Sequence, residues 1–501
     1  MSIKPNIVLI MTDQQRPDAL GCYGNKAAQT PNIDHLAQQG VTFDNCYVQN
    51  PLCCPSRYSL LTGRYPHCHR VRSNWFAPRE GETSFGHQLK RAGYSTAMIG
   101  KMHLTPWYDC FGFDGRIIAE SKFHNCPDDY ESFLNKNGTS RVELDYEKDS
   151  RFISQCSAIK SKLPQELHID SFVGRSTCEY LQKAKEPFCL FTSFLSPHNP
   201  YDPPEPYDKL FENVDLTHLN FTEGEVERKP KEVYNYMNSC LRWPFKTDEL
   251  TKKQVQLMRS HYYSLCTLID DWVGRIIEIL KTRKIFKNTV IIYTSDHGDL
   301  LGDHGLLFKQ NFYEQSVRVP LIFHAPSLFE PRRVNSIVEA IDLYRTFCDL
   351  ADTEPGKGTQ GMSLLPLLTG YENYKHKKAA FSENFFGRMI RFREFKMIYY
   401  VGKPYGELYN LDKDPDEQNN LWDIAEVVDI KRELKNLLLD WAFTSEDILP
   451  LPIRSDHFDS RPLELDYNEG RPKVSERQSW YLQDFSCLYK NWDFDESGKL
   501  R

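Results

Sequence analysis

The sequence predicts an α/β protein with a large, mostly parallel sheet covered by helices on both faces, followed by a smaller C-terminal α+β subdomain with an antiparallel sheet. Short apolar runs alternate with helical stretches up to about residue 380, which is typical of βαβ units. After that point charged and aromatic strands and turns replace them. A chain of 501 residues that is 40% hydrophobic and 26% charged can bury a large core.

Five apolar segments are expected to form buried strands of the large sheet, because turn-forming residues bound each of them. Helical periodicity lies between these strands, in the segment that begins at Thr30-Pro31 and over Leu257–Leu280. The five expected strands are Asn6–Thr12, Ser95–Ile99, Phe188–Phe194, Thr289–Ser295 and Val319–Phe323.

The C-terminal part is expected to form a separate small sheet. Met389–Phe395 and Met397–Val401 are predicted as strands, and a helix near Val427–Trp441 is predicted to close the sheet. We therefore expect a large domain over residues 1–379, the subdomain over 380–448 and an irregular tail over 449–501. The tail either wraps the large domain or meets a second subunit. In the second case the protein would be a homo-oligomer.

Charge and composition limit the partners. The net charge of −7, without a long basic run, argues against nucleic acid and anionic membranes. The first apolar run, Ile7–Met11, is too short to span a membrane, and Pro5 and Asp13 lie too close to it for a signal-peptide core. We therefore expect a cytoplasmic protein whose fourteen cysteines are reduced, unless an export segment has been trimmed.

Polar residues follow four of the predicted strands, and a lysine precedes the fifth. Each one alone has an ordinary explanation as a helix cap, a turn or a surface charge. Independent surface residues, however, have no reason to gather where parallel strands end, and open α/β sheets bind ligands at that edge. The residues are Asp13-Gln14, Lys101-Met102-His103, Ser196-Pro197-His198, Asp296-His297-Gly298 and Lys309.

The segment Pro51–Arg64 predicts a short helix from about Pro55 to Thr62. Cys53 would then lie at the helix N-terminus, where free N–H groups and the helix dipole favour an anion. Arg57, one turn further along, can reach back to the same place. Buried thiols or half of a structural zinc site are alternatives, but adjacent cysteines without a second spaced pair argue against zinc.

Cys53-Cys54-Pro55-Ser56-Arg57, followed by Leu61-Thr62-Gly63, resembles the signature C-x-P-S-R of the formylglycine-dependent sulfatases in the alkaline-phosphatase superfamily. The similarity covers most of residues 5–420, including Gly100–His103, Arg318–Leu321 and Glu407–Leu411. In that family a maturation enzyme oxidises the cysteine to formylglycine (3-oxoalanine), whose hydrate is the nucleophile. The resemblance implies that Cys53 is this residue and that Cys54 fills the variable position.

The resemblance also implies a divalent metal ion and a set of catalytic roles. The resemblance favours Ca²⁺ as this ion. Many family members have a second carboxylate in place of Gln14 and an asparagine in place of His297, and the histidine in this sequence makes Mn²⁺ the alternative. Arg57 and Lys101 would stabilise developing charge, His103 would take the proton that releases sulfate, and His198 and Lys309 would face the leaving group, with His198 as general acid. The expected ligands are Asp13, Gln14, Asp296, His297 and the converted Cys53.

The resemblance implies a sulfuric ester hydrolase, which we expect to release sulfate from a carbohydrate or another small sulfated metabolite, such as choline sulfate. Two alternatives remain. Gln14 and His297 favour a phosphonate monoester or phosphodiester hydrolase, which Lys101 and His103 oppose, and a non-catalytic metal-binding homologue would keep Cys53 unconverted. A substrate pocket near the signature would use aromatic and polar side chains, namely Arg72, Asn74, Trp75, Trp107 and Tyr108.

Overall fold

The computed structural model describes residues 4–446, apart from residues 75, 121–127, 142–145, 223, 230–249, 372–373 and 375. The described residues all belong to one unit, Met1–Leu449, and the expected tail lies outside them, so the predicted domain boundaries stay predictions. Within this described part, no helix has both the length and the hydrophobicity that a membrane crossing requires. The cysteines of the same residues are free thiols.

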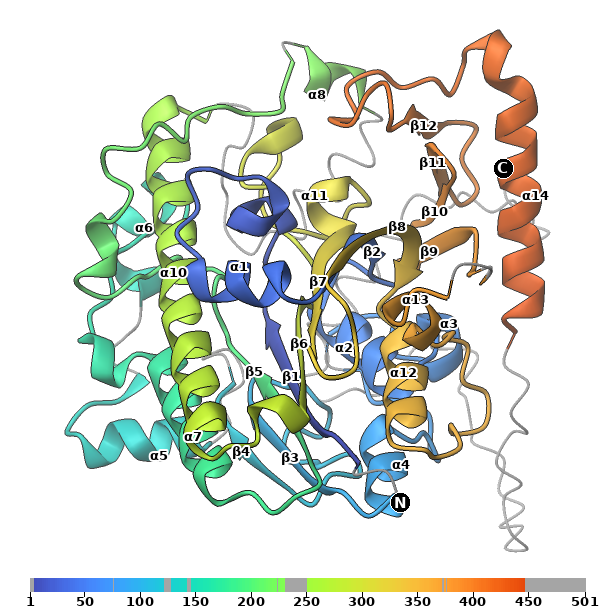
Figure 1. Ribbon diagram of the computed structural model, residues 1–501. Helices are drawn as coiled ribbons and strands as arrows, with labels where there is room; N and C mark the ends of the chain where they lie inside the picture. The colour runs from blue at the N-terminus through green and yellow to red at the C-terminus, as the bar shows by residue number, and fades with distance from the viewer. Residues whose placement is uncertain are drawn as a thin grey trace, which may run out of the picture. The chain divides into compact units, whose positions relative to one another are not determined.

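The large sheet has eight strands in the order β4-β3-β5-β1-β6-β7-β2-β8 (Figure 1). All neighbours are parallel except β7, which runs antiparallel to both β6 and β2. The predicted mostly parallel α/β sheet is therefore confirmed. The strands are β1 (Asn6–Thr12), β2 (Val41–Tyr47), β3 (Ser95–Gly100), β4 (Gly115–Ile118), β5 (Phe188–Ser193), β6 (Thr289–Ser295), β7 (Arg318–His324) and β8 (Arg332–Glu339).

Helices cover both faces of this sheet (Figure 1). Alternate residues of β1 point to opposite faces, so Val8 and Ile10 pack with α1 (Pro31–Gln38), α7 (Ile169–Lys183) and α10 (Lys252–Thr282). Leu9 and Met11 pack on the other face, in the core that includes residues of α2 (Cys53–Thr62), α4 (Phe85–Arg91) and α12 (Asp342–Leu350). The shorter helices are α3 (Pro66–His69), α5 (Asp129–Lys136), α6 (Arg151–Ser154), α8 (Glu225–Arg228), α11 (Glu314–Val317) and α13 (Leu365–Leu368).

A second, antiparallel sheet follows, in the order β12-β11-β10-β9, and α14 (Val428–Thr444) packs against it. The predicted strand Met389–Phe395 is wrong in its extent, because Arg393 and Glu394 form a two-residue turn between paired Phe392 and Phe395. Arg393 has a positive φ of 49°, which a tight hairpin turn requires. The strands are β9 (Ala379–Glu383), β10 (Gly387–Phe392), β11 (Phe395–Tyr400) and β12 (Gly406–Asn410).

The strand directions bring the predicted site residues to one edge. β1, β3, β5 and β6 are parallel and end at the same edge, while β7, which is antiparallel to β6, begins there. β2 is antiparallel to β7 and therefore also ends at this edge, and the chain then enters α2. This helix begins at Cys53 rather than Pro55, because extended Leu52 is its N-cap and its carbonyl already accepts from the amide of Ser56.

Candidate active site

The loops at this edge hold several residues in unusual backbone conformations. Gln14, His103, Phe308 and Gln310 all have φ between 56° and 78°. Residues other than glycine rarely adopt this left-handed region, and it persists only where the surrounding structure enforces it. Such residues concentrate at functional sites, and here they lie beside the side chains that the sequence analysis selected.

Cys53 is the first residue of α2 and is 1% exposed. Its Sγ lies 3.2 Å from Nε2 of His297, 3.3 Å from Nζ of Lys309 and 3.9 Å from Nζ of Lys101. Burial alone would raise the pKa of the thiol, but Lys101, Lys309 and His297 lower that pKa well below its usual value. The N-terminus of α2 and these cations therefore favour negative charge on the side chain at position 53.

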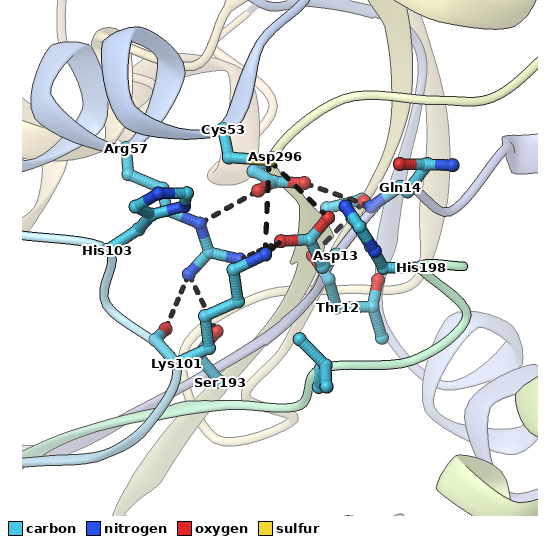
Figure 2. A network of polar contacts seen from close by, with 12 residues as sticks. Thr12, Asp13, Gln14, Cys53, Arg57, Lys101, His103, Ser193, His198 and Asp296 are labelled. Atoms are coloured by element: carbon cyan, nitrogen blue, oxygen red, sulfur yellow. Dashed lines mark hydrogen bonds and ion pairs between the residues drawn. The ribbon is translucent and has the colours of Figure 1, made fainter. Parts of the chain in front are cut away.

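Arg57 joins the carboxylates that follow β1 and β6 (Figure 2). Its Nε donates to Oδ2 of Asp296 at 2.8 Å, and one terminal nitrogen donates to Oδ2 of Asp13 at 3.0 Å. The other terminal nitrogen donates to Oγ of Ser193 and to the carbonyl oxygen of Lys101. Nζ of Lys101 also pairs with Oδ2 of Asp13, at 2.5 Å. One arginine thus connects four strands at the site.

The remaining oxygens of the two aspartates point to a common position. Oδ1 of Asp13 and Oδ1 of Asp296 lie 3.9 and 3.7 Å from Nε2 of His297. Nδ1 of His297 lies 3.0 Å from the carbonyl oxygen of Gly298, and this hydrogen bond places the proton on Nδ1 and leaves the Nε2 lone pair for a ligand. One ligand atom each from Asp13, Cys53, Asp296 and His297 lies within 4.8 Å of all the others.

This donor set fits a divalent cation with oxygen and imidazole ligands. Burial acts to raise the pKa of Asp13, but Lys101 and other cations hold that pKa well below its usual value. Burial raises the pKa of Asp296, and the negative charge of nearby Asp13 acts in the same direction, while Arg57 opposes both. A bound cation between the two carboxylates would favour the ionised form of both.

Gln14 lies beside these ligands with its amide held in one orientation. Its Nε2 donates to Oδ2 of Asp299 at 2.5 Å, and Asp299 also accepts from the hydroxyl of Tyr201. Because a carboxylate only accepts hydrogen bonds, the carbonyl oxygen of Gln14 must point the other way, where Nζ of Lys309 donates to it at 2.5 Å. Sequence reasoning missed Asp299, although it follows Asp296-His297-Gly298 directly.

The two catalytic histidines predicted from the sequence lie on different sides of the cluster, His103 beside Arg57 and His198 beside Gln14 (Figure 2). His103 is buried, and a hydrogen bond from its side chain contributes to the low pKa of Cys53. The carboxylate of Glu120, which the sequence did not single out, accepts from the amides of Met102 and His103 and so fixes this loop. All predicted catalytic and metal-binding residues therefore come together at one edge.

The residues predicted to line a substrate pocket differ from one another in burial and in contacts. Oδ1 of Asn74 accepts from the backbone amide of Cys54 at 3.1 Å, so its side chain caps the first turn of α2. Trp107 and Tyr108 pack edge to face on each other, and Tyr108 is 64% exposed. Arg72 is half-buried, and Trp75 lies outside the described residues.

A family model described as Sulfatase matches residues 5–353, and one described as N-sulphoglucosamine sulphohydrolase, C-terminal, matches residues 302–443. The chain belongs to the sulfatase family. Together with its sulfatase relatives, this membership makes the chain a sulfuric ester hydrolase.

Curated relatives of this sulfatase carry several names. It is 29% identical to an arylsulfatase of Clostridium perfringens, over 87% of this chain and 94% of the relative. It is 30% identical to a choline-sulfatase of Rhizobium meliloti, over 83% and 82% of the two chains. It is 28% identical to an N-acetylglucosamine-6-O-sulfatase of Bacteroides thetaiotaomicron, over 87% and 86%.

Solved structures share the fold. The phosphonate monoester hydrolase of Agrobacterium radiobacter is 26% identical and superposes with a TM-score of 0.77, over 88% of this sulfatase and 96% of that chain. A protein solved in complex with its substrate D-glucosamine-2-N,6-O-disulfate is 25% identical, with a TM-score of 0.72 over 90% and 99% of the two chains.

Proposed function

We propose that this sulfatase releases sulfate from a sulfate ester of a carbohydrate or another small metabolite, using a formylglycine formed from Cys53 and a divalent ion. The observation that carries this proposal is the convergence of His297 Nε2, the Oδ1 atoms of Asp13 and Asp296, and Cys53 Sγ. Ca²⁺ is the proposed ion and Mn²⁺ the alternative, because one of the ligands is an imidazole. When present, the aldehyde hydrate supplies the nucleophilic oxygen, and the ion polarises that oxygen and the sulfate.

The cations around position 53 have a direct role in this proposal. Lys101 and Lys309 lie 3.9 and 3.3 Å from Cys53 Sγ, which marks where the nucleophilic oxygen would lie. Both ammonium groups are therefore placed to stabilise negative charge on sulfate oxygens. Arg57 donates to Asp13 and Asp296 and so would hold their free oxygens in place for a bound ion.

The two histidines would handle protons on opposite sides. His103 lies beside position 53 and would accept a proton there when sulfate departs. Burial lowers the pKa of His198 to about 4, with Lys309 and Lys101 acting in the same direction. His198 is therefore neutral at pH 7 in the free protein, and the negative charge of a bound sulfate ester would have to raise its pKa before it can act as general acid.

A phosphonate monoester hydrolase is the second candidate. Gln14 and His297 favour it, and the solved phosphonate monoester hydrolase superposes over 88% of this chain. Hydrolysis rates for a matched aryl sulfate and aryl phosphonate decide between them. A higher kcat/KM for the sulfate supports the first candidate, and a higher value for the phosphonate supports the second.

The proposed nucleophile requires a maturation enzyme as partner. Protein made in a host with that enzyme should show the mass change of a thiol converted to an aldehyde in the peptide that contains Cys53. An unmodified thiol in fully active protein would contradict the proposal.

Removing the metal ion tests whether the proposed mechanism depends on it. Chelation should abolish turnover, and Ca²⁺ or Mn²⁺ should restore it. Asp13→Ala should match the chelated protein, because Asp13 contributes a charged ligand, whereas Gln14→Ala should be milder because an amide is neutral. Full activity of protein shown by elemental analysis to be metal-free would refute the metal-dependent mechanism.

A further inference from the structure

Lys309 lies in a loop whose backbone adopts an uncommon conformation. The residues on either side of it, Phe308 and Gln310, have φ of 64° and 78°. Residues other than glycine rarely adopt such positive φ values, which persist only where neighbouring groups hold the backbone. The contacts of this backbone therefore determine where the side chain of Lys309 lies.

The backbone of Gln310 is bound on two sides. Its amide donates to the carbonyl oxygen of Pro51, two residues before Cys53, at 3.1 Å. Its carbonyl oxygen accepts from Nδ2 of Asn384, also at 3.1 Å. Asn384 directly follows β9, so a side chain from the small antiparallel sheet reaches the backbone next to Lys309.

The side-chain amide of Asn384 has only one possible orientation. Its Oδ1 accepts from the backbone amides of Phe386 and Gly387, at 3.2 and 3.0 Å. Because backbone amides only donate, the oxygen must face them, and the NH₂ group must face the carbonyl oxygen of Gln310. The donor to Gln310 is thus already oriented by the turn between β9 and β10.

This turn is itself attached to the loops of the site. The ring of Phe386 packs edge to face on that of Phe312, with the centroids 6.0 Å apart. Nδ2 of Asn50 donates to the carbonyl oxygen of Glu383, the residue before Asn384, at 2.6 Å. The turn is therefore held by the segment that follows β2 and by the segment that precedes β7.

The position of the Lys309 ammonium group matters because this group lies within the cluster. Its Nζ is 3.3 Å from Sγ of Cys53 and 2.5 Å from Oε1 of Gln14. A cation stabilises a developing anion best when its position is fixed before the reaction. A misplacement of about 1 Å can lower a rate about 100-fold.

We infer that Asn384 is a positioning residue for the proposed reaction, because its side chain holds the peptide of Gln310 and thereby fixes Lys309 beside position 53. The inference rests on the proposed function and adds to it a role for the small antiparallel sheet. Loss of the Asn384 hydrogen bond should lower kcat/KM of the converted protein by about 10- to 100-fold.

Asn384→Asp isolates this hydrogen bond. One carboxylate oxygen can still accept from the amides of Phe386 and Gly387, whereas the other cannot donate to Gln310. With 4-nitrophenyl sulfate as the substrate of the full-length converted protein, Asn384→Asp and Asn384→Ala should each lower kcat/KM by about tenfold or more.

Asn420→Ala is the matched control. Asn420 makes the same kind of contacts within the small sheet, where its Oδ1 accepts from the amides of Leu408 and Trp422 and its Nδ2 donates to the carbonyl oxygen of Gly406. Its substitution removes an equivalent set of hydrogen bonds away from Lys309. It should leave kcat/KM unchanged.

A double substitution separates positioning from a general structural effect. In Lys309→Ala protein there is no ammonium group to position, so adding Asn384→Asp should leave kcat/KM unchanged. A structural role would lower kcat/KM by the same factor with and without Lys309. Equal losses in the two backgrounds, or no loss in Asn384→Asp alone, would overturn the inference.

Hydrogen exchange in the peptide that covers residues 308–312 supplies a readout without turnover. Exchange should be faster in Asn384→Asp than in the wild type and unchanged in Asn420→Ala. Unchanged exchange in Asn384→Asp would show that Asn384 does not hold the loop. Converted wild-type protein that cleaves no sulfate ester would instead refute the proposed function, and the exchange rates would still decide whether Asn384 holds the loop.

Discussion

Arg57→Met tests whether the arginine and the metal ion share the task of neutralising the two aspartates. Arg57 is 1% exposed and pairs with Asp13 at 3.0 Å and Asp296 at 2.8 Å, and both of these carboxylates are completely buried. The substitution keeps most of the side-chain volume but removes the charge and the hydrogen bonds. Two buried carboxylates are then left with Lys101 as the nearest cation, paired to Asp13 alone.

Breaking a buried ion pair by removing one partner costs about 3–5 kcal/mol. We therefore expect the free energy of unfolding of metal-free Arg57→Met to fall by about this amount. Saturating Ca²⁺ should recover much of the loss, because the ion can take over the charge of both carboxylates. Wild-type protein should gain less from Ca²⁺ than the variant does.

Urea unfolding followed by circular dichroism, with and without Ca²⁺, measures both effects. Arg151→Met is the matched control, since Arg151 forms an exposed ion pair with Asp149 far from the signature helix in sequence, and its loss should leave stability unchanged. If metal-free Arg57→Met were as stable as wild type, the pairing described for Arg57 would be refuted. An equal Ca²⁺ effect in both proteins would refute the shared neutralisation.

Four further predictions concern single residues. Cys53→Ser, if left unconverted, should react once and accumulate as a sulfated protein, visible as a mass increase, because a single hydroxyl cannot regenerate an aldehyde. Lys101→Ala should lower kcat by about 10²–10³, as expected for one preorganised donor to a developing anion, while the folded circular dichroism spectrum is kept. Asp299→Leu should weaken Ca²⁺ binding, measured by calorimetry, by about 10- to 100-fold, because the amide of Gln14 is no longer oriented. The fourth prediction concerns pH: burial acts to lower the pKa of His67, but its hydrogen bonds to Cys68 and Glu383 raise that pKa to about 10. The stability contributed by the charged His67–Glu383 pair should therefore be complete below about pH 6.5 and lost as the pH rises through about 10. In His67→Gln the thermal midpoint should change less with pH over this range than in the wild type.

Each of these predictions has its own control. Cys54→Ala should turn over normally, and dependence on Cys54 would show that the wrong cysteine was selected. Asp299→Asn keeps an acceptor for the amide of Gln14 and should lose less Ca²⁺ affinity than Asp299→Leu; equal losses would contradict the orienting role. A near-normal kcat in Lys101→Ala would show that this lysine is dispensable for turnover. If His67→Gln had the same pH dependence of the thermal midpoint as the wild type, the His67–Glu383 ion pair would not contribute to stability.

The sequence predicted the parallel sheet and the meeting of the selected side chains at one edge, because both depend on local patterns. Buried strands are continuous apolar runs, and the residues that follow them must meet at one edge, so Asp13, Lys101, His198 and Asp296 could be selected without a structure. The turn at Arg393 was missed because neither Arg393 nor Glu394 is a typical turn residue, and only the pairing of the flanking strands reveals it.

Residues that act through other residues were harder to find. Glu120 orients the His103 loop through backbone amides, and no sequence pattern connects a carboxylate to an amide seventeen residues earlier. Asp299 acts through the side chain of Gln14, 285 residues away in sequence. Asn384 contacts the loop before β7 from the small sheet, and in the sequence it is one turn-forming asparagine among several.

The burial of Cys53 sets an order of events for the chain. Its thiol is 1% exposed and is enclosed by groups that follow β1, β3 and β6, which are brought together only when strands more than 280 residues apart in sequence have paired. An enzyme that oxidises this side chain must therefore reach it before β6 pairs with β1. Under the proposed conversion of Cys53, a molecule that folds first would keep its thiol, and the active fraction of the protein would depend on whether modification precedes folding.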